Sequence, residues 1–283
     1  MECSAEMNQV KKKIDDFQLG PIDLDIQSGL ITALVGSNGA GKSTVLKMLM
    51  NLVKQDEGTI TLLNEQVDGD SEEWKEKVAY LPQSFPGLVP FTGMELKKLT
   101  SEWYPKWDER LFNKINKLFD LSLTKKFGKL SQGSQQKLKF ALTLPRNPNL
   151  LILDEPTSHM DIPSKKLLID LLVEWMEEGA RTILLATHQV EDIRKLADYL
   201  VIMDKGRMLG SFEKEELIAQ YKQYWVKGSL PPVTVPGEIE RKENMLVTKC
   251  PSQTEEFLKN RGVTWSTAKS LELDEIISIM LTK

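Results

Sequence analysis

The sequence predicts an α/β fold with a mixed central sheet, and three observations indicate this class. The runs 150–153 and 182–186 are apolar except for Thr182, and a helical pattern over 165–178 separates them. This is typical of buried parallel strands joined by a helix. A glycine-rich loop stands between a third apolar run, 30–35, and a helix. Alternating polar and apolar residues over 17–26 predict an antiparallel β-layer beside this sheet.

The length and composition narrow the classes of protein that this chain can be. Its 283 residues suffice for one large domain, or one domain with an appendage, without disulfide or metal staples. The 41 acidic and 37 basic residues are nearly balanced and indicate no electrostatic footprint for nucleic acid. Cys3 and Cys250 form no metal or disulfide motif, which favours a reducing compartment. The polar N-terminus is unlike a signal peptide, and no run of about 18 apolar residues occurs, so we expect no membrane span.

Further strands are predicted on either side of the loop and its helix. The run 58–63 alternates and predicts a second strand of the β-layer, and a short apolar strand at 78–81 ends at Pro82-Gln83. The helix that follows the glycine-rich loop, 44–53, is apolar almost all round. We therefore expect this helix to be buried.

Residues of about 84–145 are predicted to form a helical insertion into the α/β fold. Asp108 can cap a helix whose apolar residues follow helical spacing. These residues are Leu111, Phe112, Ile115, Leu118 and Phe119. Residues 138–144 belong to a further predicted helix, which ends before Pro145. We expect the aromatic residues of the insertion to pack rather than to contact a ligand; they are Trp103, Tyr104 and Trp107.

The chain is predicted to divide into a main domain, 1–212, and a C-terminal accessory region, 213–283. The main domain ends with a hairpin that turns at Lys205-Gly206. Beyond it the sequence becomes charged and is punctuated by Pro-Pro and Pro-Gly pairs. The accessory region ends in a helix-like pattern over 273–281, and the sequence indicates no role for it.

The glycine-rich loop, Gly36-Ser-Asn-Gly-Ala-Gly-Lys-Ser-Thr44, has the pattern of a phosphate-binding P-loop. Its glycines let backbone N–H groups point at a phosphate, and the helix adds its positive end. Lys42 would reach the β- and γ-phosphates, and the Ser43 hydroxyl would be a Mg²⁺ ligand. A chance glycine-rich turn is the alternative, but the flanking strand and helix favour nucleotide binding. The residues assigned to this site are Gly36, Ser37, Asn38, Gly39, Ala40, Gly41, Lys42, Ser43 and Thr44.

Two carboxylates, Asp154 and Glu155, follow the buried strand 150–153. Open α/β sheets bind ligands at the C-terminal ends of their strands. Asp154 would hold Mg²⁺ directly or through water, and Glu155 would accept a proton from a water that attacks the γ-phosphate. Alone, this pair would be interpreted as a solvated acidic turn, but its occurrence with a P-loop favours catalysis.

Together these motifs resemble the nucleotide-binding subunit of an ATP-binding cassette (ABC) transporter. The similarity covers about residues 6–212 and adds four motifs to the two above, in family order. Leu130-Ser-Gln-Gly-Ser134 is similar to the family signature LSGGQ, and Ser158-His-Met-Asp161 to the D-loop. Gln83 matches the Q-loop glutamine, and His188 the switch histidine. The resemblance implies a P-loop NTPase fold of the ABC ATPase type.

The resemblance also implies how the site works. Two subunits would pack head to tail around ATP and Mg²⁺, so that Ser131 and Gly133 of one subunit close on the γ-phosphate held by the P-loop of the other, aided by a helix dipole. Gln83 would contact the metal, Asp161 would lie near the nucleotide, and His188 would contact the γ-phosphate. The implied partners are a second ATPase subunit and an integral membrane permease, without nucleic acid, and the implied location is the cytoplasmic face of the cell membrane.

Two departures from the family pattern concern the signature and the adenine. Gln132 and Ser134 stand where the family has Gly and Gln, although the phosphate-facing Ser131 is kept. The family stacks a ring on the adenine at a position that corresponds here to Ile14, and Phe17 is the nearest ring. His159 stands in the D-loop, where we assign it no chemistry.

Within the family, three features resemble ATPase subunits of bacterial ABC-2-type exporters: the segment 17–24, the Tyr104–Asp108 segment and the C-terminal region. Such exporters move peptides, antibiotics or lipid-like compounds through a separate membrane subunit. One alternative is a soluble ABC ATPase that acts on ribosomes or DNA, which predicts a second cassette, a coiled-coil or zinc insertion, or a basic face. The other is an ATP-sensing regulatory cassette, which predicts a replaced Glu155 or His188.

Overall fold

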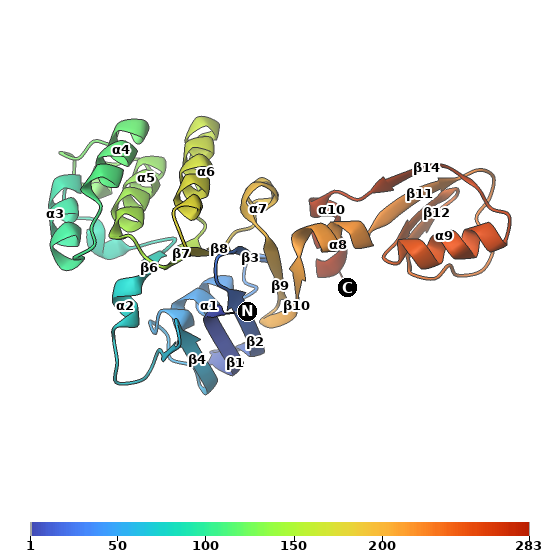
Figure 1. Ribbon diagram of the computed structural model, residues 1–283, viewed down its shortest axis with the longest axis horizontal. Coiled ribbons are helices and arrows are strands. Elements are labelled where there is room, and N and C mark those ends of the chain that lie inside the picture. The colour runs from blue at the N-terminus through green and yellow to red at the C-terminus, as the bar shows by residue number, and fades with distance from the viewer. Residues whose placement is uncertain (1, 283) are drawn as a thin grey trace. The chain divides into compact units, whose positions relative to one another are not determined.

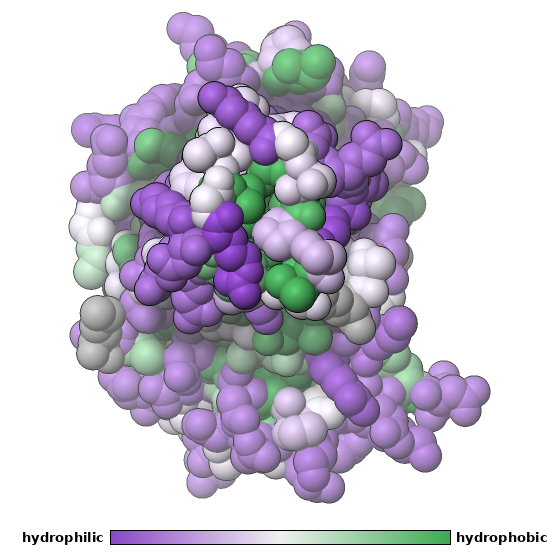
Figure 2. Space-filling model, turned by 90° about the vertical axis from the view of Figure 1, so that its right-hand side faces the viewer, coloured by the Kyte–Doolittle hydropathy of each residue, from purple (hydrophilic) through white to green (hydrophobic). Residues whose placement is uncertain are grey.

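The computed structural model describes residues 2–282 and divides the chain into two compact units, Met1–Ser211 and Phe212–Lys283 (Figure 1). Within the described residues, no helix is both long enough and apolar enough to span a bilayer. Figure 2 shows one face of the molecule, on which hydrophilic side chains surround smaller hydrophobic areas.

A six-stranded sheet forms the centre of the first unit, with the strand order β10-β9-β3-β8-β7-β6. The strands are β3 (Ile31–Gly36), β6 (Val78–Leu81), β7 (Leu150–Asp154), β8 (Thr182–Ala186), β9 (Tyr199–Asp204) and β10 (Arg207–Glu213). The strands from β9 to β6 pair in parallel. Residues of β3, β7 and β8 are buried throughout, because helices or strands cover both faces of a parallel sheet. The predicted fold class is confirmed.

An antiparallel β-layer of order β2-β1-β4-β5 lies beside this sheet. Its strands are β1 (Cys3–Ile14), β2 (Phe17–Gln27), β4 (Glu57–Leu62) and β5 (Glu65–Gln66). The sequence indicated β2 and β4 but not β1, which lies between them. The register of β1 against β2 shifts between Met7 and Val10, and Gln9 has a φ of 51°. This bulge interrupts the period of two that identifies a strand in a sequence.

Helix α1 (Lys42–Leu49) packs between the β-layer and the central sheet. The predicted helix 44–53 was wrong at both ends. Asn51 adopts a φ of 53°, which ends the helical region, and the Leu52 side chain is 64% exposed. The apolar run therefore continues beyond the helix into a surface turn.

The helical insertion contains α3 (Gly93–Trp103), α4 (Glu109–Phe119) and α5 (Gln132–Thr143), whereas the short α2 (Trp74–Lys77) precedes β6. Asp108 caps α4 as predicted, since its carboxylate accepts the Leu111 N–H at 2.9 Å. Leu118, however, is exposed. Trp103 is 79% exposed, so the expectation that it packs was wrong. Tyr104 does pack, against the Arg146 guanidinium at 3.7 Å.

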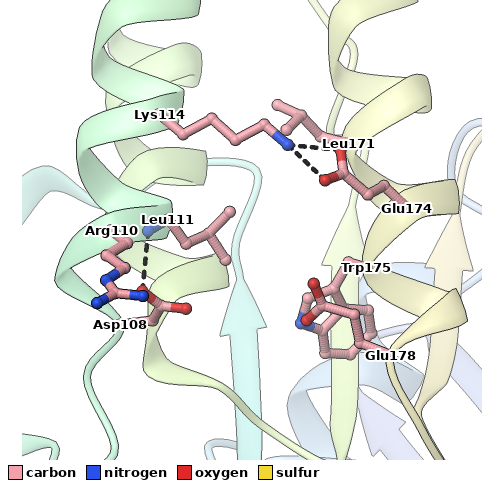
Figure 3. A pocket seen from close by; sticks show the side chains of 8 residues that line it. All are labelled: Asp108, Arg110, Leu111, Lys114, Leu171, Glu174, Trp175 and Glu178. Atoms are coloured by element: carbon pink, nitrogen blue, oxygen red, sulfur yellow. Dashed lines mark hydrogen bonds and ion pairs between the residues drawn. The ribbon is translucent and has the colours of Figure 1, made fainter.

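Helices α6 (Ile162–Glu177) and α7 (Val190–Leu196) complete the first unit. Helix α6 begins earlier than the predicted residue 165, because Asp161 caps it and accepts the Ser164 N–H at 2.8 Å. A small hollow of about 190 Å³ lies between α4 and α6, and the ion pair of Lys114 and Glu174 spans it (Figure 3).

The second unit is a small α+β fold with its own core around Tyr224, Leu246 and Leu258. Its four strands form an antiparallel sheet of order β12-β13-β11-β14. The elements are α8 (Lys214–Gln220), β11 (Lys222–Val226), β12 (Glu238–Lys242), β13 (Met245–Thr248), α9 (Pro251–Asn260), β14 (Trp265–Ser270) and α10 (Leu273–Leu281). The sequence predicted only the last helix.

Candidate active site

The P-loop connects β3 to α1 and forms one wall of a pocket of about 570 Å³. The loop requires glycine where it passes close to neighbouring backbone and where its φ is positive. A Cβ atom added at Gly36 would lie 2.3 Å from the Met203 carbonyl oxygen, and Gly41 has a φ of 105°. The pocket is lined by Ile14, Phe17, Asn38, Gly39, Ala40, Gly41, Lys42, Ser43, Thr44, Gln83 and Glu155.

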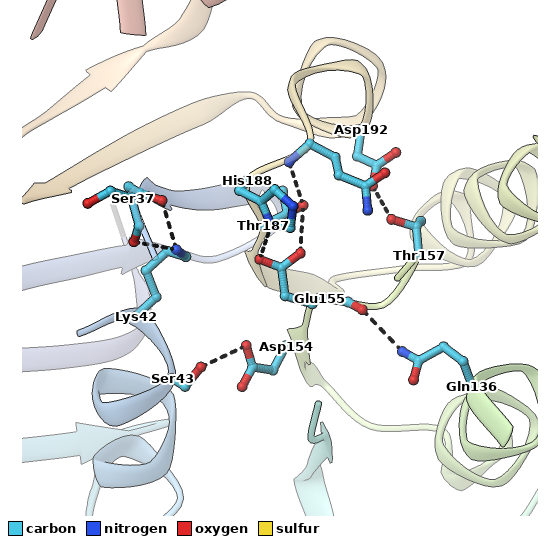
Figure 4. Close-up of polar contacts among 12 residues, drawn as sticks. Ser37, Lys42, Ser43, Gln136, Asp154, Glu155, Thr157, Thr187, His188 and Asp192 are labelled. Atoms are coloured by element: carbon cyan, nitrogen blue, oxygen red, sulfur yellow. Dashed lines mark hydrogen bonds and ion pairs between the residues drawn. The ribbon is translucent and has the colours of Figure 1, made fainter. Parts of the chain in front are cut away.

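Lys42 is folded over this loop. Its Nζ donates hydrogen bonds to the carbonyl oxygens of Gly36 at 2.8 Å and of Ser37 at 3.1 Å (Figure 4). Burial lowers the pKa of Lys42, while the Glu155 and Asp154 carboxylates oppose this shift. The ammonium group thus sits in a partly desolvated place where a phosphate would be a strong charge partner.

Ser43, which lines the pocket, and the buried Asp154 behind it bring two oxygen atoms together. The Ser43 hydroxyl donates to Asp154 Oδ1 at 3.1 Å, and Asp154 is 2% exposed. Burial raises the pKa of Asp154, which the Ser43 hydrogen bond opposes. Within residues 2–282, no three His, Cys, Asp or Glu side chains could hold a metal by themselves. A hydroxyl and a carboxylate beside a phosphate pocket fit Mg²⁺, which takes few protein ligands and binds phosphate and water oxygens.

Glu155 turns away from Asp154 and lies against the end of β8. Its Oε1 is 2.7 Å from Nδ1 of His188, and the Thr187 hydroxyl donates to Oε2 at 3.4 Å (Figure 4). The Glu155 N–H donates to the Ala186 carbonyl oxygen at 2.8 Å. The two predicted catalytic side chains are therefore in direct contact, although 33 residues separate them in the sequence.

The backbone that carries Glu155 is strained and is held by a residue that the sequence analysis missed. Glu155 has a φ of 49°, a left-handed conformation that costs of the order of 1 kcal/mol for a residue other than glycine. The buried Gln136 of α5 donates through Nε2 to the carbonyl oxygens of Glu155 at 3.2 Å and Pro156 at 2.9 Å. No motif in the sequence marks Gln136, because its two partners are 19 and 20 residues away along the chain.

The signature residues lie apart from the P-loop pocket, in what we call the signature hollow. Ser131 is exposed and caps α5, accepting the Ser134 N–H at 3.2 Å. A Cβ atom added at Gly133 would lie 2.7 Å from the His159 carbonyl oxygen. Asp161, which caps α6, also borders the hollow. The signature hollow has a volume of about 530 Å³ and is lined by Ser131, Gln132, Gly133, Ser134, Lys137, His159, Met160 and Asp161.

Ile14 and Phe17 stand side by side at the mouth of the P-loop pocket. They form the last register pair of the β1–β2 hairpin, and both line the pocket. The Phe17 ring approaches the loop so closely that a Cβ atom at Gly41 would lie 3.2 Å from its Cζ. The structure thus places both candidate adenine neighbours at the P-loop.

Comparisons with known proteins agree with this geometry. The family model described as ABC transporter matches residues 19–158. An uncharacterized ABC transporter ATP-binding protein of Methanocaldococcus jannaschii is 31% identical over 88% of this chain and 92% of its own length. The zinc uptake ATP-binding protein ZnuC of Bacillus subtilis is 31% identical over 68% and 87%. The Nod factor export ATP-binding protein I of Cupriavidus metallidurans is 30% identical over 77% and 74%.

A solved ATP-binding subunit of an ABC transporter has the same fold. It superposes with a TM-score of 0.68 at 24% identity and covers 76% of this chain and 92% of its own. Three relatives are at least 30% identical to this chain over more than two thirds of their own length. Membership of the family therefore rests on the sequence as well as on the fold. The chain belongs to the ATP-binding subunits of ABC transporters and is an ATPase that uses ATP with Mg²⁺.

Proposed function

We propose that this chain is the ATPase subunit of a bacterial ABC-2-type exporter. Two copies would close around two ATP·Mg²⁺ and drive export of a peptide, antibiotic or lipid-like substrate through a separate membrane subunit. The observation that carries the catalytic part is the contact of Glu155 with His188 at the P-loop pocket. A regulatory cassette that only senses ATP predicts replacement of Glu155 or His188, so the presence of both side chains in contact favours a hydrolysing subunit.

In the proposed reaction, Lys42 pairs with the β- and γ-phosphates, and the backbone amides of the P-loop bind them from Gly36 onward. Ser43, Asp154 and Gln83 would hold Mg²⁺, which would neutralise part of the phosphate charge. Glu155 accepts a proton from the attacking water. An ionised carboxylate only accepts hydrogen bonds, so Nδ1 of His188 carries the proton between them. This orients the imidazole. Phosphate oxygens also only accept hydrogen bonds, so a contact of Nε2 with the γ-phosphate requires a second proton on the ring.

The signature hollow supports a head-to-tail dimer. Its exposed Ser131 hydroxyl and the start of α5 have no phosphate pocket of their own, since the P-loop residues line a different pocket. A second copy would supply that phosphate. Ser131 and Gly133 would then approach the γ-phosphate, and Asp161 would border the same interface.

A largely apolar groove beside the Q-loop supports docking of a membrane permease at the cytoplasmic face of the membrane. The groove has a volume of about 610 Å³ and lies between α1, β6 and the helical insertion. Apolar side chains that border it include the exposed Phe85 and Leu52. Other exposed apolar side chains of α3, Met94, Leu99 and Trp103, extend the apolar character of this part of the surface.

Import is the second candidate function, because the relatives include both a zinc uptake and a Nod factor export ATP-binding protein. The features that favour export are the segment 17–24, the Tyr104–Asp108 segment and the second unit. Direction can be measured in proteoliposomes with this chain and ATP outside. An exporter then moves substrate into the lumen, whereas an importer moves it out.

The docking proposal is tested with a photoreactive amino acid at Phe85 and, as a control, at the exposed Val173 of α6. We expect irradiation of native membranes to link position 85, but not position 173, to an integral membrane protein. That protein, reconstituted in vesicles, should stimulate the ATPase activity, and Phe85→Asp should reduce this stimulation about tenfold while leaving the basal activity unchanged. Equal stimulation of Phe85→Asp would contradict docking at this groove.

A further inference from the structure

Lys139 is a buried cation that the mechanism above does not use. It belongs to α5, is 7% exposed and lies among the buried Leu138, Phe140 and Ala141 of that helix. Burying an ammonium group is costly unless hydrogen bonds compensate for the lost water. A lysine at this place therefore needs partners.

The partners of Lys139 are main-chain oxygens of the Q-loop. Its Nζ donates to the carbonyl oxygen of Pro82 at 3.0 Å and to that of Gln83 at 2.7 Å. Both carbonyls belong to the loop that leaves β6, directly after Leu81. One ammonium group thus binds two consecutive peptide units and restricts the conformation of the segment between them.

The contacts of Lys139 Nζ are with neutral carbonyl oxygens, and the Asp154 carboxylate is a nearby opposite charge. Asp154 ends β7, which pairs with β6 in parallel register up to Leu81 and Leu153. Lys139 therefore lies where α5, the Q-loop and the metal-binding end of β7 approach one another.

We propose that Lys139 is a positioning residue, which fixes the Gln83 main chain so that the Gln83 side chain stays in the P-loop pocket and reaches bound Mg²⁺. This rests on the proposed role of Gln83 as a metal ligand. Lys139 also lines the apolar groove that is proposed to receive the permease. A partner seated in the groove would therefore act on Gln83 through the contact of Lys139 with the Q-loop.

The experiment compares four single variants of the full chain and one double variant. The single variants are Lys139→Met, Lys139→Arg, Gln83→Ala and, as a control for loss of a lysine, Lys117→Met on the exposed face of α4. The double variant combines Lys139→Met with Gln83→Ala. Calorimetry measures the Kd of ATP with Mg²⁺ and with EDTA. Hydrogen exchange of the 82–85 segment reports the Q-loop directly. Methionine has a similar length but cannot donate, whereas arginine restores the donors.

We expect Lys139→Met to raise the Kd for Mg·ATP about tenfold, as removal of an outer-shell group does for metal sites, and to leave the Kd in EDTA unchanged. In Lys139→Met, the rate of hydrogen exchange should rise in the 82–85 segment alone. Lys139→Arg should recover most of the affinity, Lys117→Met should behave as wild type, and Lys139→Met should add little to Gln83→Ala in the double variant.

Three results would overturn the inference, each for a different reason. If Gln83→Ala weakens Mg·ATP binding but Lys139→Met does not, Lys139 has no positioning role, while the proposed role of Gln83 stands. If Gln83→Ala itself leaves Mg·ATP binding unchanged, the metal-binding role of Gln83 fails and the inference with it. A rise of exchange throughout the first unit in both Lys139 variants would assign Lys139 to fold stability instead.

Discussion

The P-loop pocket and the signature hollow carry the two halves of the proposed nucleotide site, and they are built differently. In the pocket, polar groups are already paired with one another: Lys42 with loop carbonyls, Ser43 with Asp154, and Glu155 with His188. In the hollow, Ser131 is exposed and contacts only its own helix turn among the hydrogen bonds of the described residues. We therefore expect the P-loop pocket to bind nucleotide by itself, and the signature hollow to act only when a second copy brings a phosphate to it.

The largest expected effect lies on the pocket side. Lys42→Ala removes the cation that faces the triphosphate, so we expect ATP binding to be abolished. Calorimetry on the full chain measures this, with circular dichroism as the check that the protein is folded. An unchanged affinity would mean that the P-loop does not bind the phosphates, and the comparison of the two regions would lose its basis.

The next largest effect separates chemistry from binding within the pocket. Glu155→Gln keeps the shape of the side chain but removes the proton acceptor, so turnover should fall about 10² to 10⁴-fold with nearly normal Mg·ATP affinity. Glu177→Gln, at an exposed position of α6, is the matched control and should turn over ATP as the wild type does. Normal turnover of Glu155→Gln would exclude Glu155 as the general base.

The sequence could predict the parts of the site that lie in contiguous motifs, but not those that depend on contacts between distant segments. The P-loop and the Asp154-Glu155 pair are contiguous motifs, so their residue types and spacing were sufficient to identify them. Gln136 and Lys139 were missed because their partners, the carbonyl oxygens near residues 155 and 83, are 19 and 56 residues away. Only the fold shows that α5 contacts both loops.

Three strands, β1, β12 and β14, were not predicted for a different physical reason: their sequences lack a regular apolar pattern. The bulge near Gln9 breaks the alternation of β1. Strand β12 consists of Glu-Ile-Glu-Arg-Lys and is mostly accessible, and β14 is exposed at nearly every residue. Strands at the edge of a small sheet contribute few buried side chains, so no apolar pattern marks them.

A smaller effect is expected at the mouth of the pocket, where the base would lie. Stacking on a base contributes roughly 1–3 kcal/mol, but Phe17 also packs against the β-layer core and the loop. We expect Phe17→Ala to weaken ATP binding less than about tenfold, Ile14→Tyr to tighten it, and the wild type to discriminate weakly between ATP and GTP. A much larger loss in a folded Phe17→Ala would identify Phe17 as the adenine platform.

The smallest effect concerns stability rather than binding. Burial raises the pKa of Asp154 in the folded state. Protonation of this carboxyl therefore favours the folded over the unfolded state, and this contribution to stability is lost as pH rises through the folded-state pKa. Asp154→Asn should therefore be more stable than wild type without nucleotide, by about 1 kcal/mol at neutral pH, and the gain should shrink at acidic pH. Denaturant unfolding in EDTA measures it, with the exposed Asp170→Asn as control. A less stable Asp154→Asn at neutral pH would contradict this electrostatic account.

The most direct test of the account is whether the signature hollow meets a phosphate in a second copy. An acidic substitution at Gly133 is unsuitable, since its Cβ atom would lie 2.7 Å from the His159 carbonyl oxygen. Ser131→Asn and Ser131→Asp are a matched pair instead, because both cap a helix about as well as serine and only the second adds a charge. In the Glu155→Gln background, light scattering should show that ATP induces dimers with Asn at least tenfold more readily than with Asp, while both monomers bind ATP equally. Equal dimerisation of the two variants would contradict the head-to-tail site.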